Sequence, residues 1–375
     1  MSEHYKPSYV EEPTEEINEE YSNDDLFNIT SWGADLSFRE LITMYKEGEL
    51  IKPELQRKYI WKKPEASRFI ESLLLGLPVP SIFLAEQKDE TKLIIDGYQR
   101  IMTVYDFVRG IFSQDDKTFK LTNSDKINER WRGKSFNELS ELEQRKIKKS
   151  TIHAIIFVQN HPKEDDTSLY QVFERINTTG KSLTAQEIRN CIYQGSMNNL
   201  LFKLNEDVNW RTLLGKNEVD ARMLDMEFIL RFFALQDSSI IKTEKKQISL
   251  KQHLNTFMGR VTEGKTRVDS DSFIKVMALI NHKIGENAFQ NWSTEQKDFS
   301  GRFSPTVFDA VSIATVRALA QGYDCEALLN TGKHKDLLLD EEFIEYTTKR
   351  TTNTDHIIGR VNLAAKYLYG ILYEK

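Results

Sequence analysis

Residues 93–110 read LIIDGYQRIMTVYDFVRG and place a short apolar run directly before a charged turn and an amphipathic segment. The run from Leu93 to Ile95 is typical of a buried strand, which ends at Asp96-Gly97. After the turn, apolar side chains recur at helical spacing until Gly110 provides a stop signal. The stretch therefore predicts a strand, a tight turn and a helix. The side chains expected to face the core are Met102, Tyr105 and Val108, with Ile101 and Val104 as further candidates.

The predicted turn has the chemistry of an anion site. The first N–H groups of a helix have no partner within the helix and lie at the positive end of its dipole, which favours phosphate. Gly97 lets the backbone approach a ligand, and Arg100 can add a bidentate phosphate contact. Asp96 can hold Mg²⁺ or orient a water molecule. The alternative is a helix capped by Asp96 with a surface arginine behind it, and the turn residues alone favour that alternative.

Other predicted elements surround this stretch. A helical pattern covers 36–50, and a second helix begins at Pro64 and ends at Gly76. Strands are predicted over 81–86, 92–96 and 151–159, with a polar insertion over about 113–148 between the last two. The rest of the chain has mainly helical patterns, so the strands gather in the first half.

A second polar segment, residues 53–63 (PELQRKYIWKK), lies between the first two helices. Pro53 favours extended backbone, so Tyr59 and Trp61 share one face, and Gln56 and Arg57 come directly before them. Polar side chains beside aromatic anchors are suited to ligand binding. The alternative packs both aromatic rings into the core with Arg57 outside, and the segment alone slightly favours it.

A third segment, residues 170–195 (YQVFERINTTGKSLTAQEIRNCIYQG), predicts a helical hairpin. One helix ends near Arg175, the NTTG sequence turns the chain, and Thr184 with Glu187 forms a capping box for the next helix. The polar side chains around this turn are more numerous than a simple connection requires: Glu174, Arg175, Asn177, Glu187, Arg189 and Asn190.

Taken in order, the three segments resemble the DGQQR-motif domain at the N-terminus of GmrSD-type modification-dependent restriction enzymes. The similarity spans roughly residues 30–235 and includes the later stretch DARMLDMEFILRFFAL. The resemblance implies a ParB/sulfiredoxin-like fold, binding and hydrolysis of a nucleoside triphosphate (NTP) at the DGQQR turn, and a role in bacterial defence against phage or modified DNA.

The resemblance also implies which residues form the site. Asp96 and Gln99 would be catalytic, and Asp96 would hold the metal ion. The residues implied to contact or lie near the nucleotide are Gln56, Arg57, Gly97, Tyr98, Arg100, Glu174, Asn177 and Gly180. This chain departs from the motif at Tyr98, which replaces the first glutamine of DGQQR. A tyrosine keeps a hydroxyl and adds a stacking face but cannot both donate and accept as an amide does, so nucleotide binding is expected and hydrolysis is an open question.

Charge and composition limit the class of protein. The first 30 residues contain nine acidic residues and one lysine, whereas the whole 375-residue chain has a formal net charge of −6, so the remainder is nearly neutral. Such a balance does not indicate general nucleic-acid binding. No stretch predicts a signal peptide or a membrane span, and Cys191 and Cys325 form no CxxC pair, so we expect a cytoplasmic protein without a structural zinc site.

The second half has helical apolar stripes and no recognisable nuclease motif. Two-part relatives have an HNH-type nuclease after the DGQQR domain, but the late histidines here are scattered: His253, His282, His334 and His356. His153 is expected to be a structural histidine in a strand. A short basic patch contains Lys242, Lys245, Lys246 and Lys251, which is usually a solvated face and less often a DNA contact.

The predicted fold class is α+β. We expect an acidic disordered leader over 1–30, a ParB/sulfiredoxin-like mixed α/β domain over 31–195, and an all-α domain over 196–375. The expected function is that of an NTP-binding sensor or regulator, with Mg²⁺ as the metal ion, in a restriction-type anti-phage system. It is expected to stand alone without an HNH domain, and its candidate partners are DNA and a separate nuclease or effector protein. The alternative is a DNA-binding or scaffold protein with a vestigial nucleotide pocket.

Overall fold

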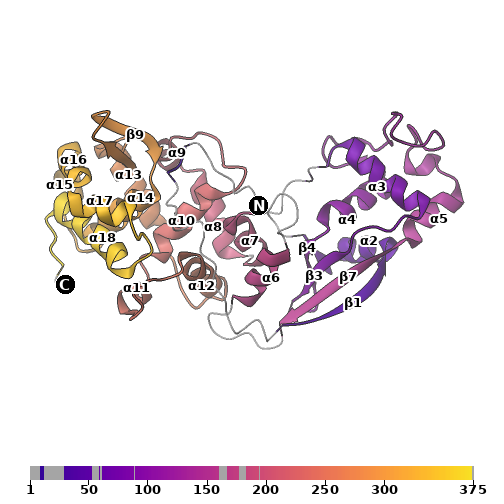
Figure 1. Ribbon diagram of the computed structural model, residues 1–375, viewed down its shortest axis with the longest axis horizontal. Helices are drawn as coiled ribbons and strands as arrows, with labels where there is room; N and C mark the ends of the chain where they lie inside the picture. The colour runs from indigo at the N-terminus through magenta and orange to yellow at the C-terminus, as the bar shows by residue number, and fades with distance from the viewer. Residues whose placement is uncertain are drawn as a thin grey trace. The chain divides into compact units, whose positions relative to one another are not determined.

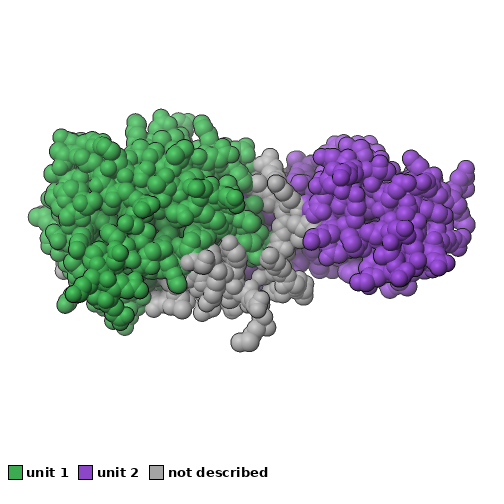
Figure 2. Space-filling model, turned by 90° about the horizontal axis from the view of Figure 1, so that it is seen from above, with its two compact units in different colours: residues 1–23, 180–189, 193–375 green, residues 24–179, 190–192 purple. Residues whose placement is uncertain are grey.

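The computed structural model describes residues 9–11, 29–52, 59, 61–87, 89–159, 167–176, 183–193 and 195–373. The chain forms two compact units, coloured separately in Figure 2. Unit 1 contains 1–23, 180–189 and 193–375, and unit 2 contains 24–179 and 190–192. Each unit has its own core of buried apolar side chains. The chain therefore divides between 179 and 180, whereas the sequence predicts a boundary after 195.

Unit 2 is built around a five-stranded mixed sheet in the order β1-β7-β3-β4-β2. β1 and β7 are antiparallel, β7 and β3 parallel, β3 and β4 antiparallel, and β4 and β2 parallel. The strands of the sheet are β1 (Ile29–Ser37), β2 (Leu50–Ile51), β3 (Ile82–Glu86), β4 (Lys92–Asp96) and β7 (Thr151–Gln159). The predicted strands at 81–86, 92–96 and 151–159 are therefore confirmed.

Helices cover one face of this sheet. Figure 1 shows α2, α3 and α4 on the same side of the strands. The alternating residues Ile152, Ala154 and Ile156 of β7 are buried in one apolar core with residues of these helices. The remaining elements of unit 2 are α2 (Phe38–Glu47), α3 (Lys63–Leu75), α4 (Tyr98–Arg109), β5 (Ile111–Phe112), β6 (Lys117–Thr118), a 3₁₀ turn (Phe136–Glu138), α5 (Glu141–Lys149) and α6 (Ser168–Ile176). The stop signals at Gly76 and Gly110 are confirmed, because α3 and α4 end at these left-handed glycines. α2 ends at left-handed Gly48, before the end of the helical pattern predicted over 36–50.

The sheet is irregular where the quoted turn begins. In the β3–β4 pair, Leu84 lies opposite Ile94, but the register then shifts and Phe83 lies opposite Asp96. Such a bulge locally disturbs the pairing and redirects side chains, and bulges are common beside functional sites. The shift therefore occurs at Asp96, the last residue of β4, directly before the start of α4.

Unit 1 is mainly helical but not entirely so. Its helices are α7 (Ala185–Ile192), α8 (Ser196–Asn205), α9 (Val208–Leu214), α10 (Leu224–Ala234), α11 (Ser238–Lys242), α12 (Leu250–Thr262), α13 (Ser270–Lys283), α14 (Pro305–Ala320), α15 (Cys325–Leu328), α16 (Thr331–Leu339), α17 (Glu341–Thr348) and α18 (Thr354–Tyr369). β8 (Gln290–Ser293) and β9 (Asp298–Phe303) form an antiparallel hairpin that the all-α expectation did not include. The α+β class of the whole chain is confirmed. Among the described residues, no helix combines the length and the apolar character needed to cross a bilayer.

Candidate functional site

The turn between β4 and α4 depends on Gly97. Its φ of +103° lies in the left-handed region, and a Cβ at this position would overlap the side chain of Ile82 on β3. Glycine is therefore required both for the backbone angle and for the close approach of the two segments. Gly97 occupies the N-cap position of α4 and has no side chain with which to cap it. Gly97 therefore leaves room beside the positive end of the α4 dipole, a place that favours a phosphate group.

Arg100 holds the turn together. Its guanidinium donates to the Asp96 carboxylate at 2.5 Å and to the carbonyls of Pro80 and Ser81 at 2.9 Å each. The Arg100 side chain is 12% exposed, whereas that of Asp96 is 44% exposed. The carboxylate is thus partly exposed, and most of the guanidinium is buried. Three of the five N–H donors of Arg100 are used within the domain.

The segment that follows Gln56 and Arg57 contacts this helix directly. The backbone N–H of Trp61 donates to Oε1 of Gln99 at 3.3 Å, and the hydroxyls of Tyr59 and Thr103 lie 2.6 Å apart. Two of the three polar segments are therefore joined, as the resemblance implies. Gln56 and Arg57 themselves lie outside the described residues.

Of the two aromatic residues of this segment, Tyr59 belongs to the core and Trp61 is partly buried against it. Tyr59 is 6% exposed and makes an edge contact with Phe112, and the ring of Trp61 makes a similar contact with Phe69. The alternative in which both rings pack into the core is the one observed. They anchor the segment beside α4.

Tyr98, the residue that departs from DGQQR, is also in the core. It is 6% exposed, and burial raises the pKa of its hydroxyl. The ammonium of Lys52 lies 5.2 Å from the centre of its ring. The stacking face expected of Tyr98 is therefore packed inside unit 2 and not displayed at the surface of the turn.

The third segment is only partly described. Glu174 is a half-buried residue of α6, whereas Asn177 and Gly180 lie outside the described residues, so their position near the turn stays a prediction. The capping box of Thr184 and Glu187 is confirmed. Glu187 pairs with Arg222 at 3.0 Å, and buried Arg189 pairs with Glu227 at 2.7 Å. These bonds account for part of the polar density around the hairpin and explain why α7 groups mainly with the helical unit.

Some parts of the site were not predicted from the sequence. Ile82 provides the side chain against which Gly97 must fit, and the carbonyls of Pro80 and Ser81 hold Arg100. The sequence provided only an indirect indication of these contacts: the PVPS sequence at 78–81 predicts a loop that leads into a strand, but not that its carbonyls bind Arg100. Backbone carbonyl ligands cannot be recognised from residue identity.

Four of the five histidines among the described residues have close structural partners, whereas His282 is largely exposed. His253, His334 and His356 each contact a backbone carbonyl oxygen, at 2.8, 2.9 and 2.8 Å. His153 contacts the carboxylate of Asp35 on the neighbouring strand at 2.9 Å. In the part of the chain that the structure describes, no three His, Cys, Asp or Glu side chains gather as a metal-binding group.

Comparison with known proteins identifies one domain. Residues 38–194 match the family model described as the GmrSD restriction endonuclease, N-terminal domain. No curated protein and no solved structure matches the chain, so the likeness to the ParB/sulfiredoxin fold stays a prediction. The match includes the turn at Asp96, the segment around Tyr59 and the capping box at Thr184. Residues 38–194 are therefore a GmrSD-type N-terminal domain.

Proposed function

We propose that the strand–turn–helix from Asp96 to Arg100 binds the phosphate groups of an NTP. The observation that supports this most strongly is the start of α4, where the N-cap residue is a left-handed glycine without a side chain and a carboxylate stands half-exposed beside it. A backbone that approaches a ligand closely at a helix N-terminus is a general solution for phosphate binding.

The turn offers one exposed carboxylate, which suits an Mg²⁺ ion that is bound together with a nucleotide. One carboxylate would not be enough for a metal ion held by protein side chains alone. Mg²⁺ in nucleotide sites is usually bound by one or two carboxylates, with phosphate oxygens and water completing its shell. Asp96 would be the protein ligand, and Arg100 would fix the direction of its carboxylate through their ion pair. When bound, the ion would neutralise phosphate charge.

The other proposed site residues have supporting roles. Gln99 would orient a water molecule or a phosphate oxygen from the first turn of α4, where its Oε1 already contacts the segment at Trp61. Gln56, Arg57, Glu174, Asn177 and Gly180 would complete the nucleotide site. Because the Tyr98 side chain is buried, it would support the turn from inside, and Tyr98 would face the nucleotide only through its backbone N–H. This arrangement favours binding and makes rapid hydrolysis a weaker expectation.

We place this activity in a restriction-type defence system. The matched family is named for a restriction endonuclease, which supports a role in defence against foreign DNA. The protein would act in the cytoplasm as a nucleotide-dependent sensor or regulator, and a separate nuclease or effector protein would cut the DNA.

Isothermal titration calorimetry with each NTP and Mg²⁺ tests the nucleotide site. The Asp96→Asn variant keeps the shape of the side chain but removes its charge, and the matched control is Asp35→Asn, another exposed carboxylate of unit 2. We expect the wild type and the control to bind one or more NTPs, and Asp96→Asn to lose most of the Mg²⁺-dependent affinity. Equal binding by all three proteins, or no binding by the folded wild type, would contradict the proposal.

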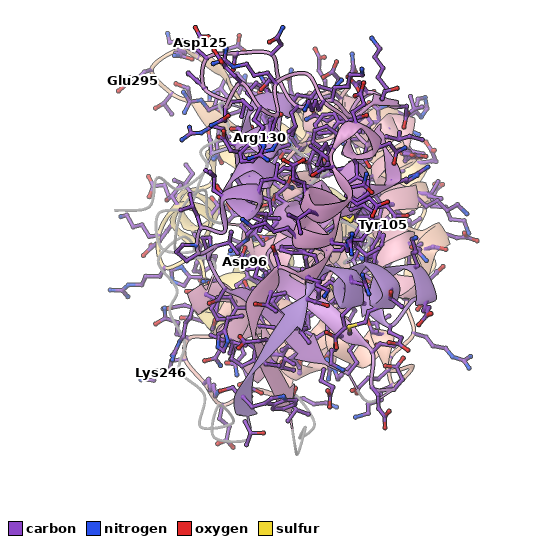
Figure 3. The ribbon with its side chains drawn as sticks, turned by 90° about the vertical axis from the view of Figure 1, so that its right-hand side faces the viewer. Asp96, Tyr105, Asp125, Arg130, Lys246 and Glu295 are labelled. Atoms are coloured by element: carbon purple, nitrogen blue, oxygen red, sulfur yellow. The ribbon has the colours of Figure 1, made fainter. Side chains whose placement is uncertain are left out.

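A second candidate function, DNA binding, is favoured by one surface of unit 1. Two segments about 100 residues apart are joined by hydrogen bonds from Ile248 N to Thr352 O and from Thr354 N to Lys246 O, at 3.1 and 3.0 Å. We call their exposed cations the basic surface: Lys242, Lys245, Lys246, Lys349 and Arg350. Lys246 is labelled in Figure 3. A local group of cations on an acidic protein can bind the phosphate backbone of DNA.

Reversing the charge of two lysines on the basic surface tests DNA binding separately from nucleotide binding. The double variant Lys245→Glu, Lys246→Glu should weaken DNA binding at least tenfold at low salt and make it less salt-dependent. The control Lys126→Glu, Lys149→Glu makes the same charge change at exposed positions of unit 2. If DNA binding is absent, or if both double variants lose it equally, the basic surface is not a DNA site.

A further inference from the structure

The acidic N-terminal region is attached to the helical unit at one described point. We call Tyr9, Val10 and Glu11 the strap, in which Val10 forms an isolated parallel bridge with Phe303, the last residue of β9. The N–H of Phe303 donates to Tyr9 O at 2.9 Å, and the N–H of Glu11 donates to Phe303 O at 2.8 Å. The strap therefore extends the edge of the β8–β9 hairpin.

The side chains of the strap fit this edge specifically. Val10 is 5% exposed and belongs to the core of unit 1. The Tyr9 hydroxyl donates to the buried carboxylate of Asp220 at 2.6 Å, and Lys216 lies 4.4 Å from the centre of the Tyr9 ring. These contacts recognise an aromatic residue followed by a small aliphatic one.

Glu11 extends the pattern to an acidic residue. Its carboxylate accepts a hydrogen bond from the side-chain amide of Asn291 on β8. Addition of an extended peptide to a sheet edge, with pockets for alternate side chains, is a general mode of peptide recognition. The edge of the hairpin is therefore suited to a Tyr-Val-Glu segment in extended conformation.

We propose that the strap is a detachable intramolecular ligand of the helical unit. Its described anchoring includes buried Val10, the partly buried ring of Tyr9, two backbone hydrogen bonds and a few polar contacts, which is little compared with the core it joins. The strap and the hairpin edge belong to the same chain, so their association is intramolecular and does not depend on the protein concentration. Weak binding is therefore enough to keep the site filled by the chain's own segment, and release of the strap vacates it.

The first test asks whether the site accepts the segment as a separate peptide. Val10→Asp in the full chain should release the strap, because it places a carboxylate in the core. The matched control is Val208→Asp, since Val208 is 76% exposed in the same unit. A fluorescent peptide of residues 5–15 (YKPSYVEEPTE) should bind the Val10→Asp protein at least tenfold more tightly than the wild type or the control. Equal affinity for all three proteins, or no binding to the Val10→Asp protein, would overturn the proposal.

A second variant and a second measurement guard against misfolding. Glu11→Pro removes the N–H that donates to Phe303 without altering a buried side chain, and it should also open the site to the peptide. Hydrogen exchange in the wild type compares two buried amides, Phe303 N–H, bonded to the strap, and Ser304 N–H, bonded to Phe289 O. Phe303 should exchange at least tenfold faster because detachment exposes it. Equally slow exchange at both amides would mean that the strap is a permanent part of the fold.

Discussion

Gly97 and Arg100 stabilise the same turn by different means. Gly97 accepts a left-handed backbone angle in a place where Ile82 leaves no room for a Cβ. Arg100 connects the turn to the preceding loop and aims the Asp96 carboxylate. The sequence correctly indicated a special glycine at the turn. It did not indicate that the arginine is bound mainly to the protein, because carbonyl partners leave no trace in the sequence.

At the residue scale, Gly97→Ala should be much more destabilising than Gly110→Ala. Both glycines are left-handed, which costs alanine roughly 1–2 kcal/mol, but a Cβ at Gly110 would meet nothing within 4 Å. At Gly97 the overlap with Ile82 should add about 1–3 kcal/mol. Urea unfolding of the two variants measures the difference. Equal losses of stability would show that the space around Gly97 can adjust.

At the scale of elements, capping signals and alternation predicted most of unit 2 but not its edge. The strands β3, β4 and β7 have apolar residues in the core, and α2, α3 and α4 end at glycines. β1 was missed because most of its residues are exposed, so it shows little alternation. The β8–β9 hairpin was missed for a similar reason, since its strands are short and polar. Edge strands depend on their neighbours more than on their own sequence.

The capping box of α7 gives a prediction at this scale. The Thr184 hydroxyl accepts from Glu187 N and also donates to the carbonyl of Arg222 at 2.8 Å. Thr184→Ala should therefore destabilise the protein by about 1–2 kcal/mol. The control Thr212→Ala removes an exposed hydroxyl that donates only to the carbonyl of Val208, one turn earlier in the helix. It should lower the free energy of unfolding by less than about 0.5 kcal/mol. Thermal unfolding of the two variants at equal concentration would show the difference, and similar melting temperatures would contradict it.

For the molecule as a whole, buried charge is concentrated in unit 1. Asp309 pairs with both Arg231 and Arg360, at 2.5 and 2.9 Å, and all three side chains are almost fully buried. Removing one partner of such a group leaves an uncompensated charge and is strongly destabilising. The sequence could not show these pairs, because their members lie 78 and 51 residues apart. The apolar stripes of α14 and α18 were predictable, but the ion pairs between the helices were not.

His334 should make the stability of unit 1 depend on pH. Burial lowers the pKa of its imidazole to about 4, although its ring contacts the carbonyl of Ala288. The unfolded chain takes up a proton at this residue below about pH 6.5, whereas the folded chain resists it until about pH 4. The contribution of neutral His334 to the free energy of unfolding is therefore complete above pH 6.5 and decreases as the pH falls from 6.5 to 4. At pH 5 the loss is about 2 kcal/mol. Urea unfolding at pH 7 and pH 5 should show a smaller loss in His334→Gln than in the wild type, and equal losses would contradict the prediction.

The central claim is that the start of α4 binds the phosphates of a nucleotide, and backbone amide NMR tests it most directly. During titration with each NTP and Mg²⁺, the amide signals of Gly97, Tyr98, Gln99 and Arg100 should shift most, because these N–H groups would face the phosphate. The amides of Leu250 and Lys251, at the start of α12 in unit 1, are the internal control and should stay in place. Saturable shifts at 97–100 alone are the result we predict. Unchanged signals at 97–100 with every NTP, or shifts confined to the start of α12, would contradict the account.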